Sequence, residues 1–513
     1  MLQRLRTAHP AAQVTGLAAL AFAILFGTLG VRNHQNFGTW SYDMGIYDQG
    51  LWLLSRGHMF MTVRGLNFWG HHINLIGVAF VPFYWLGAGP SFLYVVQACV
   101  LALGAVPTYL IARDRFGQPW MGLVFAVVYL MYAPVQWISW AMFHPEALVI
   151  TPLLFAWWFA TQGRWRWCYA MVFVALSTRE DAALAVLMLG LVLMITLRGA
   201  PDRQRVLRMC GAMMALGAMW YVVATSLVIP WFNDGKVPFY ITYFYGGYGH
   251  STPQVVWSIV RHPGRVVHDM VQQDRRRFYW RMSWPLGWTF LANPLALLVA
   301  APQLMASVLG GSPYARMIEY QYTSVMIAPA IIASIQGAWV FWRFKLAKVL
   351  LPVWLLGCSL VTNGLWSPSP LNSDRYTVWA VPEPRNDSLR HALALVPPDA
   401  SVVASYLLLA HLTHRQHAFD WPNPFVPSVW GNNDCAHLPD PRSVDYVVID
   451  LRNVGESNQT LLADMTTEGG PFATVYRDSA VVVLHRVGTS PEVDTYPQQI
   501  GCAALSATIH PRP

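Results

Sequence analysis

Ionisable and polar side chains gather in four short segments of this sequence, each beside a long hydrophobic run. Ionisable groups at a membrane are costly unless they are paired or hydrated, so these positions are candidate functional residues. In chain order they are Asp43, Asp48, Gln49, His71, His72, His144, Glu146, Arg179, Glu180, Asp181, Arg316, Tyr320 and Tyr322. These residue types favour proton transfer and anion binding.

Asp43 and Glu180 are the candidate catalytic residues, and the others are interpreted as substrate-binding residues. A carboxylate could help to bind or activate a substrate. Arg179 could bind phosphate, because the arginine fork binds phosphate through paired hydrogen bonds. Asp43 with Glu180 could hold a divalent cation (Mg²⁺ or Mn²⁺), or the site could work without one.

Several of these residues could instead have a purely structural role. Asp43 could cap a short amphipathic helix predicted over residues 46–55 and lying along the surface. Arg179 could simply pair with Asp181, and Tyr320 and Tyr322 could be membrane-interface anchors.

The elements that must position these residues are membrane helices. Hydrophobic residues make up 55% of the 513 residues and charged residues only 12%, against about 25% charged in soluble domains. Apolar runs of bilayer length recur through the first 363 residues, which predicts an integral membrane protein with about 11–13 hydrophobic helices. Only three of the 34 basic residues are lysines, which indicates a GC-rich bacterial source and therefore a bacterial cytoplasmic membrane.

Basic clusters flank the hydrophobic runs, as in cytoplasmic loops that follow the positive-inside rule. Because they are short and separated by spans, they argue against nucleic-acid binding. By the same rule, the candidate residues face outside. The clusters are Arg4/Arg6, Arg113/Arg115, Arg164/Arg166, Arg198 to Arg208 and Arg343 to Lys348.

Hydrophobicity predicts spans at about 14–31, 91–112, 118–133, 147–162, 167–177, 182–197 and 209–231, a short stretch at 75–86, and further apolar segments near 282–292, 294–309, 323–341 and 349–363. After the first span, two full crossings between Asn74 and Arg113 would place that basic cluster outside. The short segment near 75–86, which a proline interrupts, is therefore expected to insert only partly.

Composition changes near residue 362, which predicts a membrane module over 1–363 and an extracytoplasmic α/β domain over 364–513. Strands are expected in "ASVVASYLL", "VDYVVIDL" and "SAVVVLHRV", and a helix in "DSLRHALALV", with mainly parallel strands. No glycine-rich phosphate loop follows these strands. Cys435 and Cys502 would pair in an oxidising compartment.

The segments "YDMGIYDQGLW", "GHHIN", "FHPE", "STREDAAL" and "YQYTSVMIAP" together resemble the bacterial membrane family designated domain of unknown function 2079. That family is similar to the GT-C superfamily of polytopic glycosyltransferases. The resemblance implies interfacial helices, a polyprenyl-phosphate-linked sugar donor and an aspartate in the first outer loop acting as base or metal ligand. Asp43 matches that aspartate best and Asp48 second, while Glu146 or Glu180 matches the later acidic position. The chemistry implied by the resemblance would make Asp43 the base that deprotonates an acceptor hydroxyl, with Arg179, His72 and Arg316 stabilising the departing phosphate. No WWD motif and no adjacent acidic pair in the first loop are present, which leaves metal use open.

The expected function is therefore transfer of a sugar from a polyprenyl-phosphate donor to a glycan, lipid or protein acceptor at the outer face of the membrane. A single displacement would invert the anomeric configuration. Two alternatives remain: a transporter or flippase for a lipid or small molecule, and a non-catalytic envelope scaffold. A transporter would show charges at mid-span positions and inverted repeats, neither of which is evident.

Overall fold

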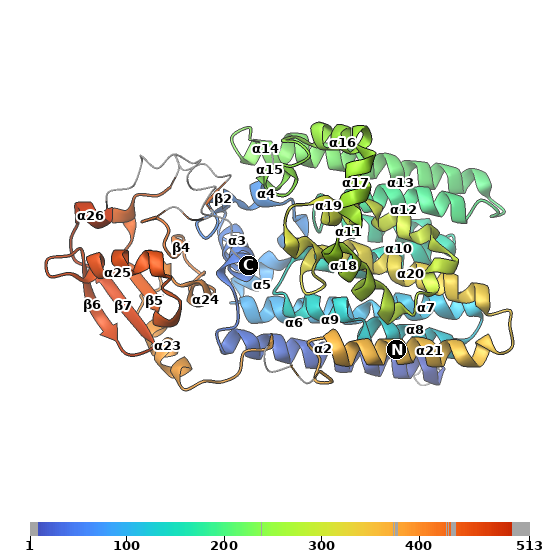
Figure 1. The fold of residues 1–513 in the computed structure, drawn as a ribbon, viewed down its shortest axis with the longest axis horizontal. Coiled ribbons are helices and arrows are strands. Elements are labelled where there is room, and N and C mark those ends of the chain that lie inside the picture. The colour runs from blue at the N-terminus through green and yellow to red at the C-terminus, as the bar shows by residue number, and fades with distance from the viewer. Residues whose placement is uncertain are drawn as a thin grey trace.

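The computed structural model describes residues 9–236, 239–372, 374, 378–426, 428, 430, 431 and 438–494. Long helices form its larger part, and a domain with a five-stranded sheet lies at one end of them (Figure 1). The expected architecture of a polytopic helical membrane protein with a C-terminal α/β domain is confirmed. Cys435 and Cys502, predicted to pair, lie outside the described residues.

Five helical segments of the described chain are long and apolar enough to cross a membrane. They are α2 (Pro10–Gln35), α6 with α7 (Pro90–Leu103, Ala105–Phe116), α13 with α14 (Arg203–Val223, Ile229–Phe232), α20 (Ser324–Phe341) and α21 (Ala347–Trp366). The pair α8 and α9 (Pro119–Met131, Ala133–Trp140) meets the same criterion together but bends by 43°.

Shorter apolar helices complete the helical part. They are α5 with its preceding turn (Leu75–Trp85), α10 with its preceding turn (Pro145–Thr161), α11 (Trp165–Leu176), α12 (Ala182–Thr196) and the segment ending in α19 (Pro294–Leu309). Together with the longer spans, they reach the lower end of the predicted range of hydrophobic helices.

The first span, α2, shows how the sequence sets these helices. It begins at Pro10, which suits a first helical position, after the His9 ring accepts the Ala11 N–H at 3.2 Å. It ends just before Phe37, whose φ of 63° cannot continue a helix. One face leaves large apolar side chains exposed, which suits contact with lipid: Val14, Leu17, Leu20, Ile24 and Leu25.

The segment Leu75–Trp85 is too short to cross the membrane, in agreement with the prediction from its length and proline. Because α6 and α7 make one crossing, Arg113 and Arg115 lie at the end of the bundle opposite the first polar loop. Arg115 lies 3.8 Å from the ring centroid of Trp339 on α20, so the ends of α7 and α20 meet there.

The chain between α18 (Gln273–Ser283) and α20 is irregular. The apolar segment near 282–292 forms short 3-10 helices, and the one near 294–309 forms another over Pro294–Ala300, followed by α19 (Ala301–Leu309). This chain packs tightly on α20: a Cβ added to Gly337 would lie 1.9 Å from the Thr289 carbonyl oxygen. Irregular backbone at membrane depth is tolerated only where protein covers it, as α20 does here.

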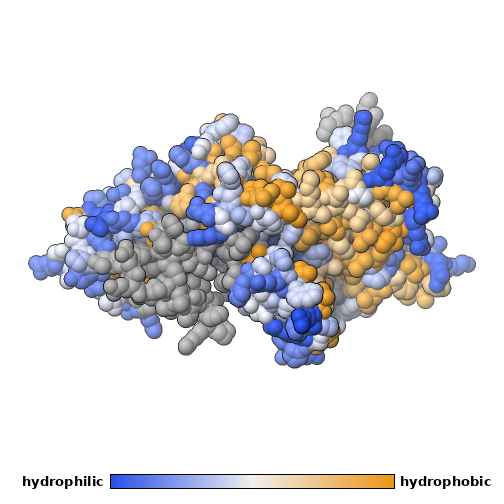
Figure 2. Space-filling view, turned by 90° about the horizontal axis from the view of Figure 1, so that it is seen from above, coloured by the Kyte–Doolittle hydropathy of each residue, from blue (hydrophilic) through white to orange (hydrophobic). Residues whose placement is uncertain are grey.

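The stretch after the predicted span at 209–231 forms four short helices, α15 (Phe239–Tyr245), α16 (Thr252–Arg261), α17 (Pro263–Met270) and α18. In Figure 1, α15 and α16 lie beside the end of α13 and α14. Viewed from above, hydrophobic residues cover much of the helical part, whereas the C-terminal domain is more hydrophilic (Figure 2).

The C-terminal domain contains a mixed sheet with strand order β4-β3-β5-β7-β6. The predicted strands form as β3 (Val402–Ala404), β5 (Tyr446–Asp450) and β7 (Val481–Arg486), and the predicted helix as α23 (Arg385–Ala394). The strands β4 (Ala418–Asp420) and β6 (Phe472–Arg477) were not predicted. Since β7 is antiparallel to both β5 and β6, the expectation of mainly parallel strands is only half right.

Candidate active site

The loop that carries Asp43 has an unusual backbone. Asp43 has φ 73° and ψ −96°, a left-handed region that is costly for a residue with a Cβ. It precedes α3 (Ile46–Leu54), the predicted short helix, but no side chain caps that helix. The capping explanation for Asp43 is therefore wrong. The helix itself is largely buried beneath the C-terminal domain and does not lie along the surface.

Asp43 faces His144. Its Oδ1 lies 3.1 Å from His144 Nε2, with 29% of the aspartate side chain exposed and the histidine almost fully buried. The His144 N–H donates to Gln97 Oε1 at 2.9 Å, which fixes the histidine backbone against α6. Burial alone would lower the pKa of His144, but the Asp43 carboxylate and Glu146 raise it overall. The imidazole is thus set to donate a hydrogen bond to Asp43.

Arg179 lies between two carboxylates. Its Nη1 donates to buried Glu146, while its Nε and Nη2 donate to the two oxygens of Asp181, the Nε bond measuring 2.8 Å. Glu146 Oε2 is buried without a protein partner among the described residues. Arg179 is therefore held firmly from one side by Glu146 and through its fork by Asp181.

Glu180 belongs to a separate pair with His72. Its Oε1 lies 2.7 Å from His72 Nδ1, and its Oε2 accepts the Ile73 N–H at 3.0 Å. Burial would raise the pKa of Glu180, but His72 and Arg179 lower it to about 2. The His72 ring stacks on Tyr240 of α15 with ring centroids 5.4 Å apart.

Tyr47 of α3 lies among these groups. The pKa of its hydroxyl is raised well above the usual value by burial and then by the charges of Glu146, Asp43 and Glu180, against the opposing charge of Arg179. The Tyr47 ring also lies against that of His144, with ring centroids 5.6 Å apart, and Glu146 follows His144 by two residues. The Asp43–His144 pair and the Arg179–Glu146 pair therefore belong to one polar region.

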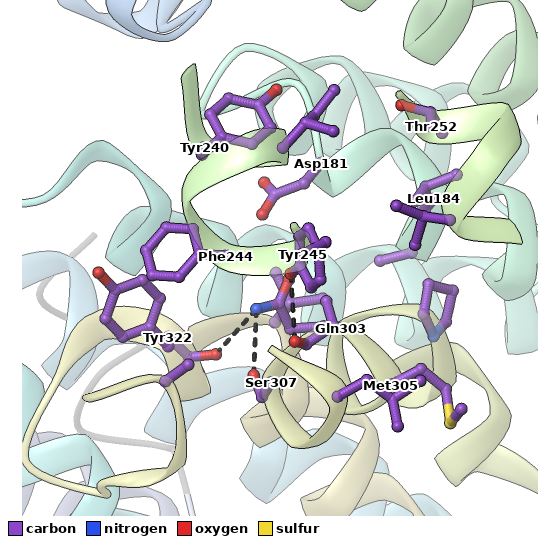
Figure 3. A pocket seen from close by; sticks show the side chains of 18 of the residues that line it. Asp181, Leu184, Tyr240, Phe244, Tyr245, Thr252, Gln303, Met305, Ser307 and Tyr322 are labelled. Atoms are coloured by element: carbon purple, nitrogen blue, oxygen red, sulfur yellow. Dashed lines mark hydrogen bonds between the residues drawn. The ribbon is translucent and has the colours of Figure 1, made fainter. Parts of the chain in front are cut away.

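A cavity of about 330 Å³ opens beside this polar region. Its polar end includes His72, Arg179, Asp181, Tyr240 and Tyr245, and Figure 3 shows Asp181 between Tyr240 and Tyr245. The remaining wall is mostly apolar and comes from α12, α16, α19 and α20, with Leu184, Val256, Ile259, Met305 and Val325 among its members. Such a cavity fits a ligand with an anionic head and an apolar tail.

The predicted residues Asp48 and Gln49 lie elsewhere, against the C-terminal domain. Asp48 is fully buried, accepts the Tyr84 hydroxyl at 2.7 Å and pairs with His414 Nε2 at 3.1 Å. Gln49 Nε2 donates to Thr62 Oγ1 at 2.9 Å. These contacts hold the first loop to the C-terminal domain.

Arg316 also lies outside the cavity. Its Nε donates to Asp274 Oδ2 at 2.5 Å, and its Nη1 donates to the Gly310 carbonyl at 2.6 Å. These bonds tie α18 to the end of α19, so a role in holding phosphate has no support from its position.

The remaining predicted residues divide between the two parts of the polar region. Tyr322 lines the cavity, and Tyr320 lies against Trp40 with ring centroids 6.3 Å apart, on the Asp43 side. His71 is buried beside His72, with ring centroids 4.5 Å apart. Burial first, and then His72, lower the pKa of His71 well below its usual value.

Several side chains near the site were not predicted, because they come from segments without a charged motif. Tyr406 of α24 (Tyr406–Leu409) stacks near Trp40 and Tyr42, with ring centroids 6.2 and 6.3 Å apart. Its hydroxyl pKa is raised by burial and then by Asp43. Tyr240 and Tyr245 come from α15, which the sequence presented as loop. Aromatic spacing alone gave no signal for any of them.

Asp420 of β4 is the buried acid of the C-terminal domain that faces the first loop. It accepts the Ser41 hydroxyl at 2.6 Å, and burial raises its pKa to about 7. A carboxyl group whose pKa is raised on folding costs stability once the unfolded acid ionises. This penalty grows from the unfolded pKa, about 4, up to the folded pKa of about 7, and it is constant above that value.

We expect Asp420→Asn to raise the free energy of unfolding by roughly 1–3 kcal/mol at pH 8, because the amide removes a buried charge. At pH 5 the gain should be smaller, because only the part of the penalty between the unfolded pKa, about 4, and pH 5 has developed. Thermal unfolding of the full chain at the two pH values measures this. A gain of equal size at both would contradict the buried-charge explanation.

Asp43 and Glu180 do not share a metal site in this arrangement, since each pairs with a different histidine. Within the described residues, no group of three or more His, Cys, Asp or Glu side chains is arranged to hold a metal ion. The predicted divalent cation stays a prediction with no geometric support from this pair.

A family model described as "Predicted membrane protein (DUF2079)" matches residues 33–483. No curated protein matches the sequence. Among solved structures, the chain is similar to ArnT from Cupriavidus metallidurans bound to undecaprenyl phosphate, with 14% identity and a TM-score of 0.54. That likeness covers 92% of this chain and 98% of the other, and it confirms the expected similarity to the GT-C fold.

Proposed function

The chain belongs to the DUF2079 family of membrane proteins, and we propose that it is a GT-C-type glycosyltransferase using a polyprenyl-phosphate-linked sugar. The observation that carries this proposal is the nearness of a base candidate to an anion site with an apolar extension. Asp43 pairs with His144, and Arg179 lies at the head of the apolar cavity. A fold similar to that of a protein bound to undecaprenyl phosphate adds support.

In the proposed reaction, the Asp43 carboxylate takes the proton of an acceptor hydroxyl as that oxygen attacks the anomeric carbon. The bond from this carbon to the phosphate oxygen breaks, and the phosphate leaves with both bonding electrons. Arg179, with the His72 side of the cavity, stabilises the charge of the leaving phosphate. A single displacement of this kind inverts the anomeric centre.

The proposed orientation follows from charge. The basic residues at the ends of α7 and α20 lie opposite the C-terminal domain. By the positive-inside rule, they face the cytoplasm, so the domain and Asp43 face outward. The polyprenyl chain would stay in the bilayer while its sugar reaches the aqueous side.

The test is lipid mass spectrometry on a strain that lacks the gene, with the wild-type gene restored as the control. Accumulation of one polyprenyl-phosphate sugar in the deletion, reversed by the restored gene, would support the proposal and identify the donor. An unchanged lipid profile would favour the transporter or scaffold alternatives.

The C-terminal domain is proposed to form one wall of the sugar site. Tyr406 joins Trp40, Tyr42 and Tyr320 around the partly exposed Asp43. Aromatic faces suit the apolar faces of sugar rings, and their hydroxyls can orient sugar oxygens.

We expect Tyr406→Ala to raise the KM for the acceptor or donor sugar roughly tenfold, because a stacking face is lost. Tyr406→Phe keeps the aromatic ring, so its KM should rise much less. Steady-state kinetics of the purified full chain measures both variants. Equal losses in both would contradict a stacking role, and wild-type KM in both would remove Tyr406 from the site.

A further inference from the structure

At the head of the cavity, carboxylates occupy the cationic group that an anionic ligand would bind. Arg179 is the positive group there, and it already binds Glu146 and Asp181, with Glu180 next along the chain. A phosphate entering this arrangement would meet more negative than positive charge. One of the carboxylates must therefore give up its place when a phosphate binds.

The two carboxylates that bind Arg179 differ in position. Glu146 is 3% exposed and binds Nη1 from the protein interior. Asp181 is 23% exposed, lines the cavity and binds the Nε and Nη2 edge through both of its oxygens. That two-oxygen geometry is the one by which an arginine fork binds phosphate.

Among the described residues, the hydrogen bonds of the Asp181 side chain come from Arg179. Asp181 is the residue before α12, yet its side chain makes no capping hydrogen bond to that helix. The cavity beside it is also lined by Tyr221 and Thr252, whose hydroxyl groups a displaced carboxylate can approach. The Tyr245 hydroxyl, in contrast, donates to the Ala306 carbonyl at 3.1 Å (Figure 3). Glu146 is almost fully buried and is not among the residues that line the cavity.

We infer that Asp181 occupies the phosphate position on Arg179 in the unliganded protein and that the phosphate of the ligand displaces it. This inference rests on the proposed function and concerns the same cavity. Without ligand, Asp181 neutralises a buried guanidinium that would otherwise be costly. With ligand, Glu146 keeps Arg179 in place while phosphate oxygens take over its Nε and Nη2 edge.

Asp181 also sets selectivity in this arrangement. A small anion without an apolar part cannot displace the Asp181 carboxylate, which is held next to Arg179 by the chain itself. A phosphate monoester or diester with a prenyl chain gains further contacts along the apolar wall of the cavity. The cavity thus selects a ligand that brings both a phosphate and a hydrocarbon chain.

The test measures binding of farnesyl phosphate, farnesol and inorganic phosphate to the purified full chain in detergent. We expect Asp181→Asn to bind farnesyl phosphate roughly tenfold or more tightly than wild type, because a competing charge is removed. Asp181→Glu keeps the charge and should not tighten binding. Asp274→Asn is the matched control, since it removes a carboxylate from buried Arg316 outside the cavity.

If Asp181→Asn binds farnesol more tightly by the same factor as farnesyl phosphate, or binds no ligand more tightly than wild type, the inference is overturned. A gain for inorganic phosphate equal to that for farnesyl phosphate would keep the exchange at Arg179 but reject the prenyl chain as part of the ligand. These outcomes are separate from the proposed reaction, which the lipid profile of the deletion strain tests independently.

Discussion

Asp43→Asn is expected to abolish transfer, with a loss of at least about a hundredfold in kcat, while the protein stays folded. Asparagine keeps the size of the side chain and can still contact His144, but it cannot take the acceptor proton. Because 29% of the Asp43 side chain is exposed and its carboxylate contacts one histidine, little stability depends on its charge. The lipid-linked sugar isolated from the deletion strain serves as the donor, and its rate of consumption by the purified full chain at saturating concentration gives kcat. Thermal unfolding shows whether the variant is folded.

Asp48→Asn is the control from the same loop, and it should lower stability while leaving turnover unchanged. Asp48 accepts from Tyr84 and Thr413 and pairs with His414, so its loss should weaken the contact between α3 and the C-terminal domain by about 1–3 kcal/mol. Its turnover per folded molecule should stay near that of wild type. Full activity of Asp43→Asn, or a larger kcat loss in Asp48→Asn, would move the base to another residue.

The sequence was sufficient to predict the membrane helices because their signal is local. A run of apolar residues as long as the bilayer predicts a span whatever it packs against, and α2, α20 and α21 fulfil that expectation. The segment between α18 and α20 did not follow this logic. Its 3-10 turns depend on close contact with Gly337, which no local pattern reveals.

The polar candidates were found for a similar reason, but of their partners only Asp181, for Arg179, was anticipated. Charged residues beside apolar runs stand out in the sequence, so Arg179 and Glu180 were identified. Which carboxylate pairs with which cation depends on the packing of the loops before α10 and α12. Tyr406 and Asp420 lie far along the chain from Asp43, and only the docking of the C-terminal domain brings them to it.

Asp48 and Asp43 show the limit most clearly. They lie five residues apart in one motif, and the sequence offered no physical reason to separate their roles. In the fold, a positive φ at Asp43 turns one carboxylate toward His144, whereas α3 carries the other into a buried contact with the C-terminal domain. Backbone geometry of this kind cannot be deduced from residue types.

Arg179→Lys is expected to lower kcat at least about a hundredfold and to weaken binding of the lipid phosphate. A lysine keeps the positive charge but offers a point charge in place of the planar fork that spans Glu146 and the phosphate position. Arg179→Gln removes the charge as well and leaves two carboxylates without their partner, which should cost about 3–5 kcal/mol of stability. Kinetics, farnesyl phosphate binding and thermal unfolding of the full chain measure the three effects.

Arg316→Lys serves as the matched control, because Arg316 is also buried and bound to a carboxylate but lies outside the cavity. It should lose stability without a specific loss of farnesyl phosphate binding. If the lysine variant at position 179 loses stability only, and kcat per folded molecule stays at the wild-type value, Arg179 is a structural ion pair. If kcat and phosphate binding fall together while the fold persists, the buried charges around Arg179 exist to hold and release an anion. A scaffold has no need of that property, so this outcome separates the enzyme from its non-catalytic alternative.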